Sequence, residues 1–125
     1  MTPTKEQYEL AAKAAGGTLY YDTRFDVRFI PQGTAPEFNV LSLPQWRPHE
    51  DRADAFSLLC AIKGDLSIRE NAVYCLSIRE NAVYFSTNTL QTDTVSAEHL
   101  AKEEIEAAAC EVIFLCAVEV GRGLA

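Results

Sequence analysis

Apolar residues recur every three to four positions in three segments of the chain, which is the period of a helix with one buried face. The first segment begins with Thr4 and Gln7, whose spacing is that of a capping box, and it ends before Gly16. The last segment ends at Gly121 and Gly123, which act as C-terminal stop signals. The pattern therefore predicts three helices, at about residues 5–15, 52–63 and 97–120.

The same periodicity predicts which side chains form the core. Residues 112–118 are apolar without interruption, so the last helix should run through the centre of the core or meet a partner. Only the apolar stripes of the last two helices are wide enough to cover a sheet face. The side chains expected to be buried on these stripes are Phe56, Leu59, Ile105, Val112 and Cys116.

Between the first two helices the pattern changes to the alternation of a strand. Residues 18–22 and 24–30 should pair as a half-buried hairpin that turns at Asp22 and Thr23. Residues 31–48 contain four prolines and should form a long loop, in which residues 38–43 could add a short edge strand.

A tandem duplication follows the second helix, at residues 66–75 and 76–85. Nine positions are identical in the two copies, and Cys75 of the first copy corresponds to Phe85 of the second. Two copies with so short a period do not build a solenoid, so we interpret the repeat as a local duplication of a strand-turn-strand unit. Each copy turns at a Glu-Asn pair, because Asn tolerates left-handed φ, and the product is a three-stranded meander.

The middle strand of this meander carries Val73 and Ile78, five residues apart, and an odd separation puts them on opposite faces. The apolar set of each hairpin would then need its own cover. A bulge or break near residues 74–76, or a dimer, is favoured over an unbroken strand with helices on both faces. The two apolar sets are Leu66, Ile68, Val73 and Cys75 on one face, and Leu76, Ile78, Val83 and Phe85 on the other.

Charge and composition exclude several classes of partner. Eighteen acidic and eleven basic residues give a net charge of −7, so the chain lacks the basic patch that a nucleic acid requires. The longest apolar run is far shorter than the roughly 20 residues that cross a bilayer, so we expect no membrane partner and a cytoplasmic location. The four cysteines lack the C-x-x-C spacing of metal or redox sites, and we expect all of them to be buried in a reducing compartment.

We find no sequence pattern for a catalytic residue, a metal site or a cofactor, and we expect no enzymatic activity. The candidate binding residues are Trp46, Arg47, His49 and Arg52, because Trp and Arg dominate interaction hot spots. For Trp46 we favour the alternative role of pinning the loop to the core. For His49, followed by two acids, we favour an ordinary helix start over a metal ligand.

Several segments resemble one phage family. They are the Ala-rich opening at residues 10–16, Trp46-Arg47-Pro48, Asp51-Arg52-Ala53-Asp54-Ala55, a short hairpin and a final Ala-rich helix that ends near Gly121-Arg122. The chain is similar to the phage ABA-sandwich (NinX-like) proteins of tailed phages and prophages over residues 5–16 and 46–122. The second hairpin copy departs from the family pattern. The resemblance implies an α+β sandwich and an accessory role, and it supplies no catalytic residue.

Together these observations predict one α+β domain over residues 1–125, in which an antiparallel sheet of hairpins packs with three helices as a sandwich. The predicted function is a non-enzymatic phage or prophage accessory protein in the host cytoplasm that binds a host protein and counteracts host defence. The alternative is a small-ligand-binding protein or minor enzyme with a pocket near the loop at residues 31–48, with Trp46, His49 and Arg52 at its mouth. A homodimer could form through the duplicated hairpin or the C-terminal helix.

Overall fold

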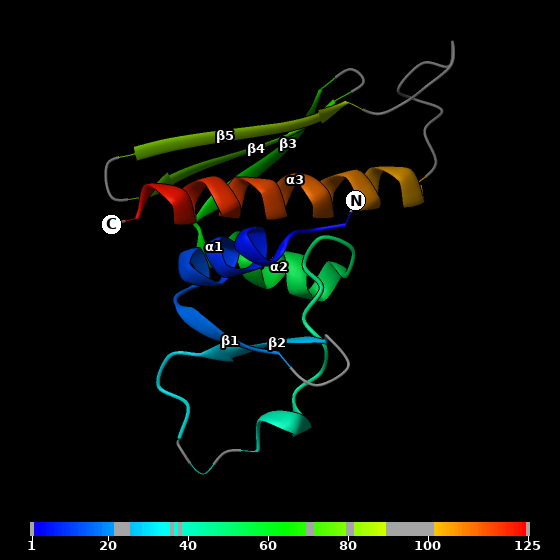
Figure 1. Ribbon diagram of the computed structural model, residues 1–125. Helices are drawn as coiled ribbons and strands as arrows, with labels where there is room; N and C mark the ends of the chain where they lie inside the picture. Colours follow the sequence, from blue (N-terminus) through cyan, green and yellow to red (C-terminus); the bar gives the residue numbers. More distant parts are fainter. Residues whose placement is uncertain are drawn as a thin grey trace.

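Three α-helices, one 3-10 helix and five strands make up the part of the chain that the computed structural model describes. That part comprises residues 2–21, 26–35, 37, 39–69, 72–79, 82–89 and 102–124. The strands form two separate antiparallel sheets, of two and three strands, and the predicted α+β class with three helices is confirmed. Figure 1 shows the two sheets at opposite ends of the molecule with the helices between them.

The first helix, α1 (Lys5–Ala15), begins and ends as its sequence predicts. The Gln7 backbone N–H donates to the Thr4 hydroxyl at 3.2 Å, and the Thr4 N–H donates to the Gln7 side chain at 2.9 Å. Gly16 closes the helix with a φ of 79°, a left-handed conformation that glycine adopts without a steric penalty. The buried residues of α1 are all alanines, so another helix can approach its backbone closely.

That neighbour is α3 (Lys102–Gly123), which lies between the three-stranded sheet and the other two helices (Figure 1). Its apolar stretch at residues 112–118 is mostly buried, which confirms a course through the core. The predicted start, at residues 97–101, lies outside the described residues. Gly121 and Gly123 were expected to stop this helix. The helix ends at Gly123 as expected, but the prediction for Gly121 is wrong. The helix continues through Gly121. A glycine is needed at this position because a Cβ would overlap the backbone oxygen of Leu10, where the two helices cross.

The second helix, α2 (Arg52–Ala61), starts at the side chain of Asp51, which accepts from the Asp54 N–H, and it ends two residues before the predicted limit. Its buried face carries Ala55 and Leu58. The prediction that Phe56 is buried is wrong, because its side chain is 65% exposed on the outer face of the helix. Leu59 and Ile105 are only partly buried, whereas Val112 and Cys116 are fully buried as expected.

The smaller sheet pairs β1 (Gly17–Tyr21) with β2 (Val27–Pro31). Tyr21 pairs with Val27, so the connection spans residues 22–26, and the predicted turn at Asp22 and Thr23 falls outside the described residues. The suggested edge strand at residues 38–43 is not formed. The 3-10 helix η1 (Val40–Ser42) stands there instead, because the Asn39 side chain accepts from the Leu41 N–H and starts a turn.

The larger sheet is the predicted meander, in the order β3 (Gly64–Arg69), β4 (Ala72–Arg79), β5 (Ala82–Thr89). Its register confirms the two-residue connections, since Arg69 pairs with Ala72 and Arg79 with Ala82. Ile68 pairs with Val73 and Leu76 with Phe85, and strand alternation places Val73 and Leu76 on opposite faces of β4, as predicted.

The expected bulge or break in β4 is wrong, because the strand keeps one regular register over its whole length. Val73, Cys75 and Ser77 are buried on the face that α3 covers. Ser77 is polar at a core position, but its hydroxyl donates to the Ile62 carbonyl, so the alternation continues without an unpaired buried group. All three helices lie on the same side of this sheet in Figure 1.

Candidate functional site

Trp46 joins the proline-rich loop to the core. Its side chain is only 7% exposed, its ring stacks on Phe29 at a centroid distance of 5.1 Å, and the Tyr8 ring lies at 6.3 Å. Its backbone N–H donates to the Val27 carbonyl at 2.6 Å, on the side of β2 away from β1. Trp46 therefore holds the loop against the core and presents little of its ring to a partner.

His49 is also buried, with 8% of its surface exposed. Its ring lies 6.0 Å from Tyr8 and 5.9 Å from Phe114, measured between centroids. Burial in this aromatic cluster lowers the pKa of His49, because the imidazolium loses its hydration, and the nearby Glu50 carboxylate opposes the effect. The Nδ1 atom has no hydrogen-bond partner within the described part of the chain.

Arg47 and Arg52 lie on the surface at the start of α2. Arg47 forms an ion pair with Glu50 at 3.2 Å, and its backbone N–H donates to Asp54 at 2.9 Å. Arg52 reaches across to Glu106 of α3 at 3.1 Å while its own side chain stays 70% exposed. The four predicted site residues thus divide into a buried aromatic pair and an exposed pair of arginines.

Phe56 is the residue that sequence reasoning missed. It follows Arg52 by one helical turn, so the two side chains are neighbours on the exposed face of α2. We call Arg52 and Phe56, with the nearby Arg47, the α2 surface. The signal was present in the sequence, because Ala55, Leu58 and Ile62 also form an apolar stripe, and a helix that buries this stripe turns Phe56 about 100° away from Ala55.

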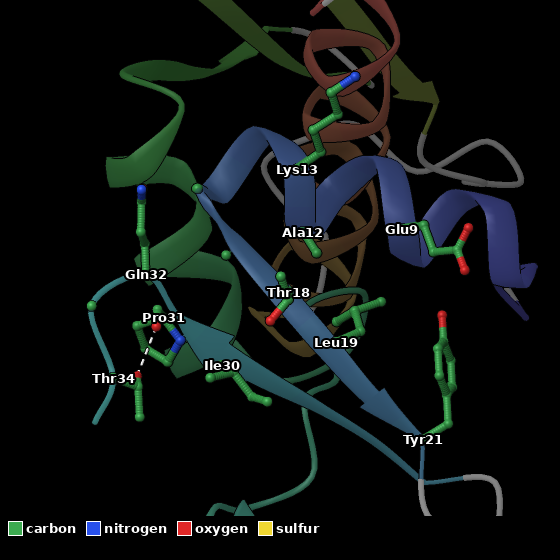
Figure 2. A pocket seen from close by; sticks show the side chains of 13 residues that line it. Glu9, Ala12, Lys13, Thr18, Leu19, Tyr21, Ile30, Pro31, Gln32 and Thr34 are labelled. Carbon is green, nitrogen blue, oxygen red and sulfur yellow. Dashed lines mark hydrogen bonds between the residues drawn. The ribbon is translucent and has the colours of Figure 1, made fainter. Parts of the chain in front are cut away.

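An open groove of about 680 Å³ lies between α1 and the β1–β2 hairpin (Figure 2). Glu9 and Lys13 border it on α1, Leu19 and Tyr21 on β1, and residues 30–34 on the hairpin and the start of the proline-rich loop. Trp46, His49 and Arg52 do not line this groove.

The charged groups of the groove are already held by neighbours. Burial, together with the nearby Glu9 carboxylate, raises the pKa of Tyr21. Lys5 lies over the Tyr21 ring at 5.3 Å, and Lys13 donates to the Leu124 carbonyl at 2.7 Å. Glu9 therefore lies at the Tyr21 end of the groove, whereas Lys13 lies one helical turn further along α1.

Only three of the four cysteines are buried, so the expectation that all four are buried is wrong. Cys60 is exposed on α2, which turns it away from the core, whereas Cys75, Cys110 and Cys116 are buried. Cys75 of β4 is hydrogen-bonded to Cys116 of α3, and this bond together with burial raises the pKa of Cys75. Among the described residues, no three potential metal ligands come together.

A scan against protein-family models finds no match to this chain, and searches of curated proteins and of solved structures find none either. The likeness to the phage ABA-sandwich proteins stays a prediction from the residues that carry it. Within the described ranges, no helix has both the length and the apolar character that a membrane span requires.

Proposed function

We propose that this protein is a non-enzymatic phage or prophage accessory protein that binds a host protein through the α2 surface. The observation that carries the proposal is the 65% exposure of Phe56 on a helix whose other face is packed in the core. A large aromatic ring held in water is costly, and it contributes to binding once a partner covers it. The resemblance to phage proteins supports the accessory role, the host cytoplasm as its location and an action against host defence.

The surroundings of Phe56 suit an interaction hot spot. Arg52 stands one turn away, and aromatic residues and arginine are the residue types enriched at such positions. Its side chain forms an ion pair with Glu106 at 3.1 Å and stays 70% exposed, so the guanidinium remains accessible to a partner. Ala55 and Leu58 anchor the helix from behind, which makes the surface rigid.

These features define the chemistry of the partner. It should offer an apolar pocket for one phenyl ring, with polar groups at the rim that meet Arg47 and Arg52. Since the chain carries a net charge of −7, long-range attraction would favour a partner with a net positive charge.

Capture from a host lysate with the purified protein as bait tests the proposal. We expect one host protein to be retained at near-stoichiometric amount by the wild type and to be lost with Phe56→Asp. Leu41→Asp is the matched control, because Leu41 of η1 is 60% exposed and lies outside the α2 surface. Retention by both variants, or no retained protein, would contradict the proposal.

The alternative, a small-ligand-binding protein or minor enzyme, would use the groove in Figure 2. Its volume of about 680 Å³ lies in the range of ligand pockets, and the start of the proline-rich loop lines it, but Trp46, His49 and Arg52, which were expected at its mouth, do not. A thermal shift with a metabolite collection separates the two functions. A ligand-dependent rise in melting temperature, without a captured protein, would favour the alternative.

A further inference from the structure

Two cysteine side chains meet in the core between the larger sheet and the helix that covers it. Cys75 of β4 and Cys116 of α3 are both fully buried, and their thiols are hydrogen-bonded to each other. Cys75 lies on the face of the sheet that packs against α3. The contact therefore joins two elements that are far apart in the sequence.

The other two cysteines do not compete for this contact. Cys60 is exposed on α2, whereas both members of the pair are buried. Cys110 is six residues before Cys116 on the same helix, a separation that places the two side chains on different faces. Its charged neighbours include Asp51 at the start of α2, so Cys110 faces that helix and not β4. Each thiol of the pair thus has one sulfur within reach.

The tandem duplication sets position 75 apart from the rest of the repeat. The two copies are identical at nine positions, and the tenth is Cys75 in the first copy and Phe85 in the second. The one position at which the copies differ is therefore the position that brings a thiol to Cys116.

We propose that Cys75 and Cys116 form an intramolecular disulfide when the protein meets a peroxide, and that this bond fastens the sheet to α3. A disulfide has an S–S bond of about 2.05 Å and Cβ atoms about 3.5–4.5 Å apart. Two sulfurs that are already in contact reach this geometry by rotation of the side chains and a small approach of the helix to the strand.

The hydrogen bond also selects the sulfur that reacts first. The Cys75 thiol donates to Cys116, which raises the pKa of Cys75 and lowers the pKa of Cys116, although burial opposes the second shift. Burial raises the pKa of Cys110. Because the thiolate is the nucleophile, Cys116 should be the most reactive of the three buried cysteines.

The reaction balances with one molecule of hydrogen peroxide. The Cys116 thiolate attacks one peroxide oxygen, the O–O bond breaks, and the departing hydroxide takes up the proton that Cys116 released, which gives water and a sulfenic acid on Cys116. The Cys75 sulfur then attacks the Cys116 sulfur, the S–O bond breaks, and the hydroxide leaves with the Cys75 proton as a second water. The two thiols are oxidised, and the peroxide is reduced. A peroxide is small and uncharged, so it reaches the pair when the core opens locally.

Peroxide treatment followed by unfolding, alkylation of the remaining thiols and mass spectrometry tests the proposal. The Cys60→Ser protein is used, because the exposed thiol would otherwise be oxidised first. We expect a product that has lost two hydrogen atoms, in which only Cys110 is alkylated and the peptides of Cys75 and Cys116 are joined. Cys110→Ala in the same background is the matched control and should form the same link, whereas Cys75→Ala and Cys116→Ala should not.

Amide hydrogen exchange of the linked protein provides a second measurement. Exchange of the most protected amides of β4 and α3 should become about tenfold slower or more than in the dithiol form, because the link restricts the unfolded chain. Dithiothreitol should restore the original rates.

Three results would overturn the proposal: thiols of Cys75 and Cys116 that stay reduced, sulfinic or sulfonic acids at these positions without a link, or a link that includes Cys110. A link that forms only after the protein is unfolded would also overturn it. The peptide map of the Cys60→Ser protein decides the question even where an alanine variant fails to fold. Phe56 and the α2 surface take no part in the measurement, so its result is independent of host binding.

Discussion

Gly121 of α3 lies directly against the backbone of Leu10 in α1, so that a Cβ added at Gly121 would approach the Leu10 oxygen well within 3.0 Å. This crossing explains why the first helix is rich in alanine and why the last helix contains a glycine before its end. Gly121 and Leu10 are far apart in the sequence. It connects the two ends of the described chain and holds α1 under the buried stretch of α3.

Gly121→Ala should therefore lower the free energy of unfolding by about 1–2 kcal/mol, because the cost of overpacking exceeds the roughly 1 kcal/mol that alanine adds to helix propensity. Urea denaturation measures this difference. Gly123→Ala is the control, since that position is exposed in the last turn of the same helix and should be neutral or stabilising. Equal effects of the two variants would show that the helices do not touch at Gly121.

His49 makes the stability of the protein depend on pH. Burial lowers the pKa of His49 in the folded protein, whereas the unfolded chain has the ordinary value of about 6.5. Below that pH the unfolded chain binds more protons than the folded protein, so the free energy of unfolding falls as the pH decreases.

His49→Phe should lose less stability than the wild type between about pH 7.5 and pH 5.5, because its ring fits among Tyr8 and Phe114 and does not titrate. Chemical denaturation at the two pH values measures the difference, and both proteins share every other titrating group. Parallel pH dependences for the two proteins would show that His49 is hydrated or paired in the folded state.

The four cysteines should differ in reactivity toward a disulfide reagent. Cys60 is exposed and should react rapidly in the native protein, whereas Cys75, Cys110 and Cys116 are buried and should react only after unfolding. Burial also raises the pKa of Cys110, which reduces its thiolate content further. Colorimetric titration should find one fast thiol, and Cys60→Ser should abolish it. Two or more fast thiols would mean that β4 and α3 separate readily.

Deletion of residues 66–75 should leave a folded protein. The two copies differ only at Cys75 and Phe85, so in the shortened chain Val83 can take the position of Val73 and Phe85 that of Cys75. The larger Phe side chain should be accommodated by a small shift of α3. Cooperative thermal unfolding and a dispersed amide NMR spectrum are expected. A variant without tertiary structure would show that the central strand is indispensable.

Local signals in the sequence are sufficient to predict the starts of α1 and α2 and the register of the larger sheet. The capping box at Thr4 and the Glu-Asn connections depend on residues only a few positions apart, and the structure agrees with each described part of them. The unbroken β4 was not predicted, because the odd separation of Val73 and Ile78 indicated that a regular strand would leave one apolar set without cover.

The candidate surface depends on contacts that no local pattern determines. A stripe through Phe56 and a stripe through Leu58 are both apolar, and only the position of α3 decides which one is buried. The role of Gly121 could not be predicted from the sequence either, because a glycine can end a helix or can allow two helices to cross closely. Trp46 and His49 were identified as notable residues, but their burial follows from the aromatic neighbours that α1, β2 and α3 supply.

The most direct test of host-protein binding through the α2 surface is isothermal titration calorimetry. It measures the affinity of the captured partner for the wild type, Phe56→Ala and Leu41→Ala. We expect Phe56→Ala to weaken the dissociation constant about 30-fold or more, which corresponds to the roughly 2 kcal/mol of a hot spot. Leu41→Ala, which shortens another exposed apolar side chain, should change it less than about threefold. Equal affinities for the wild type and Phe56→Ala would contradict the account.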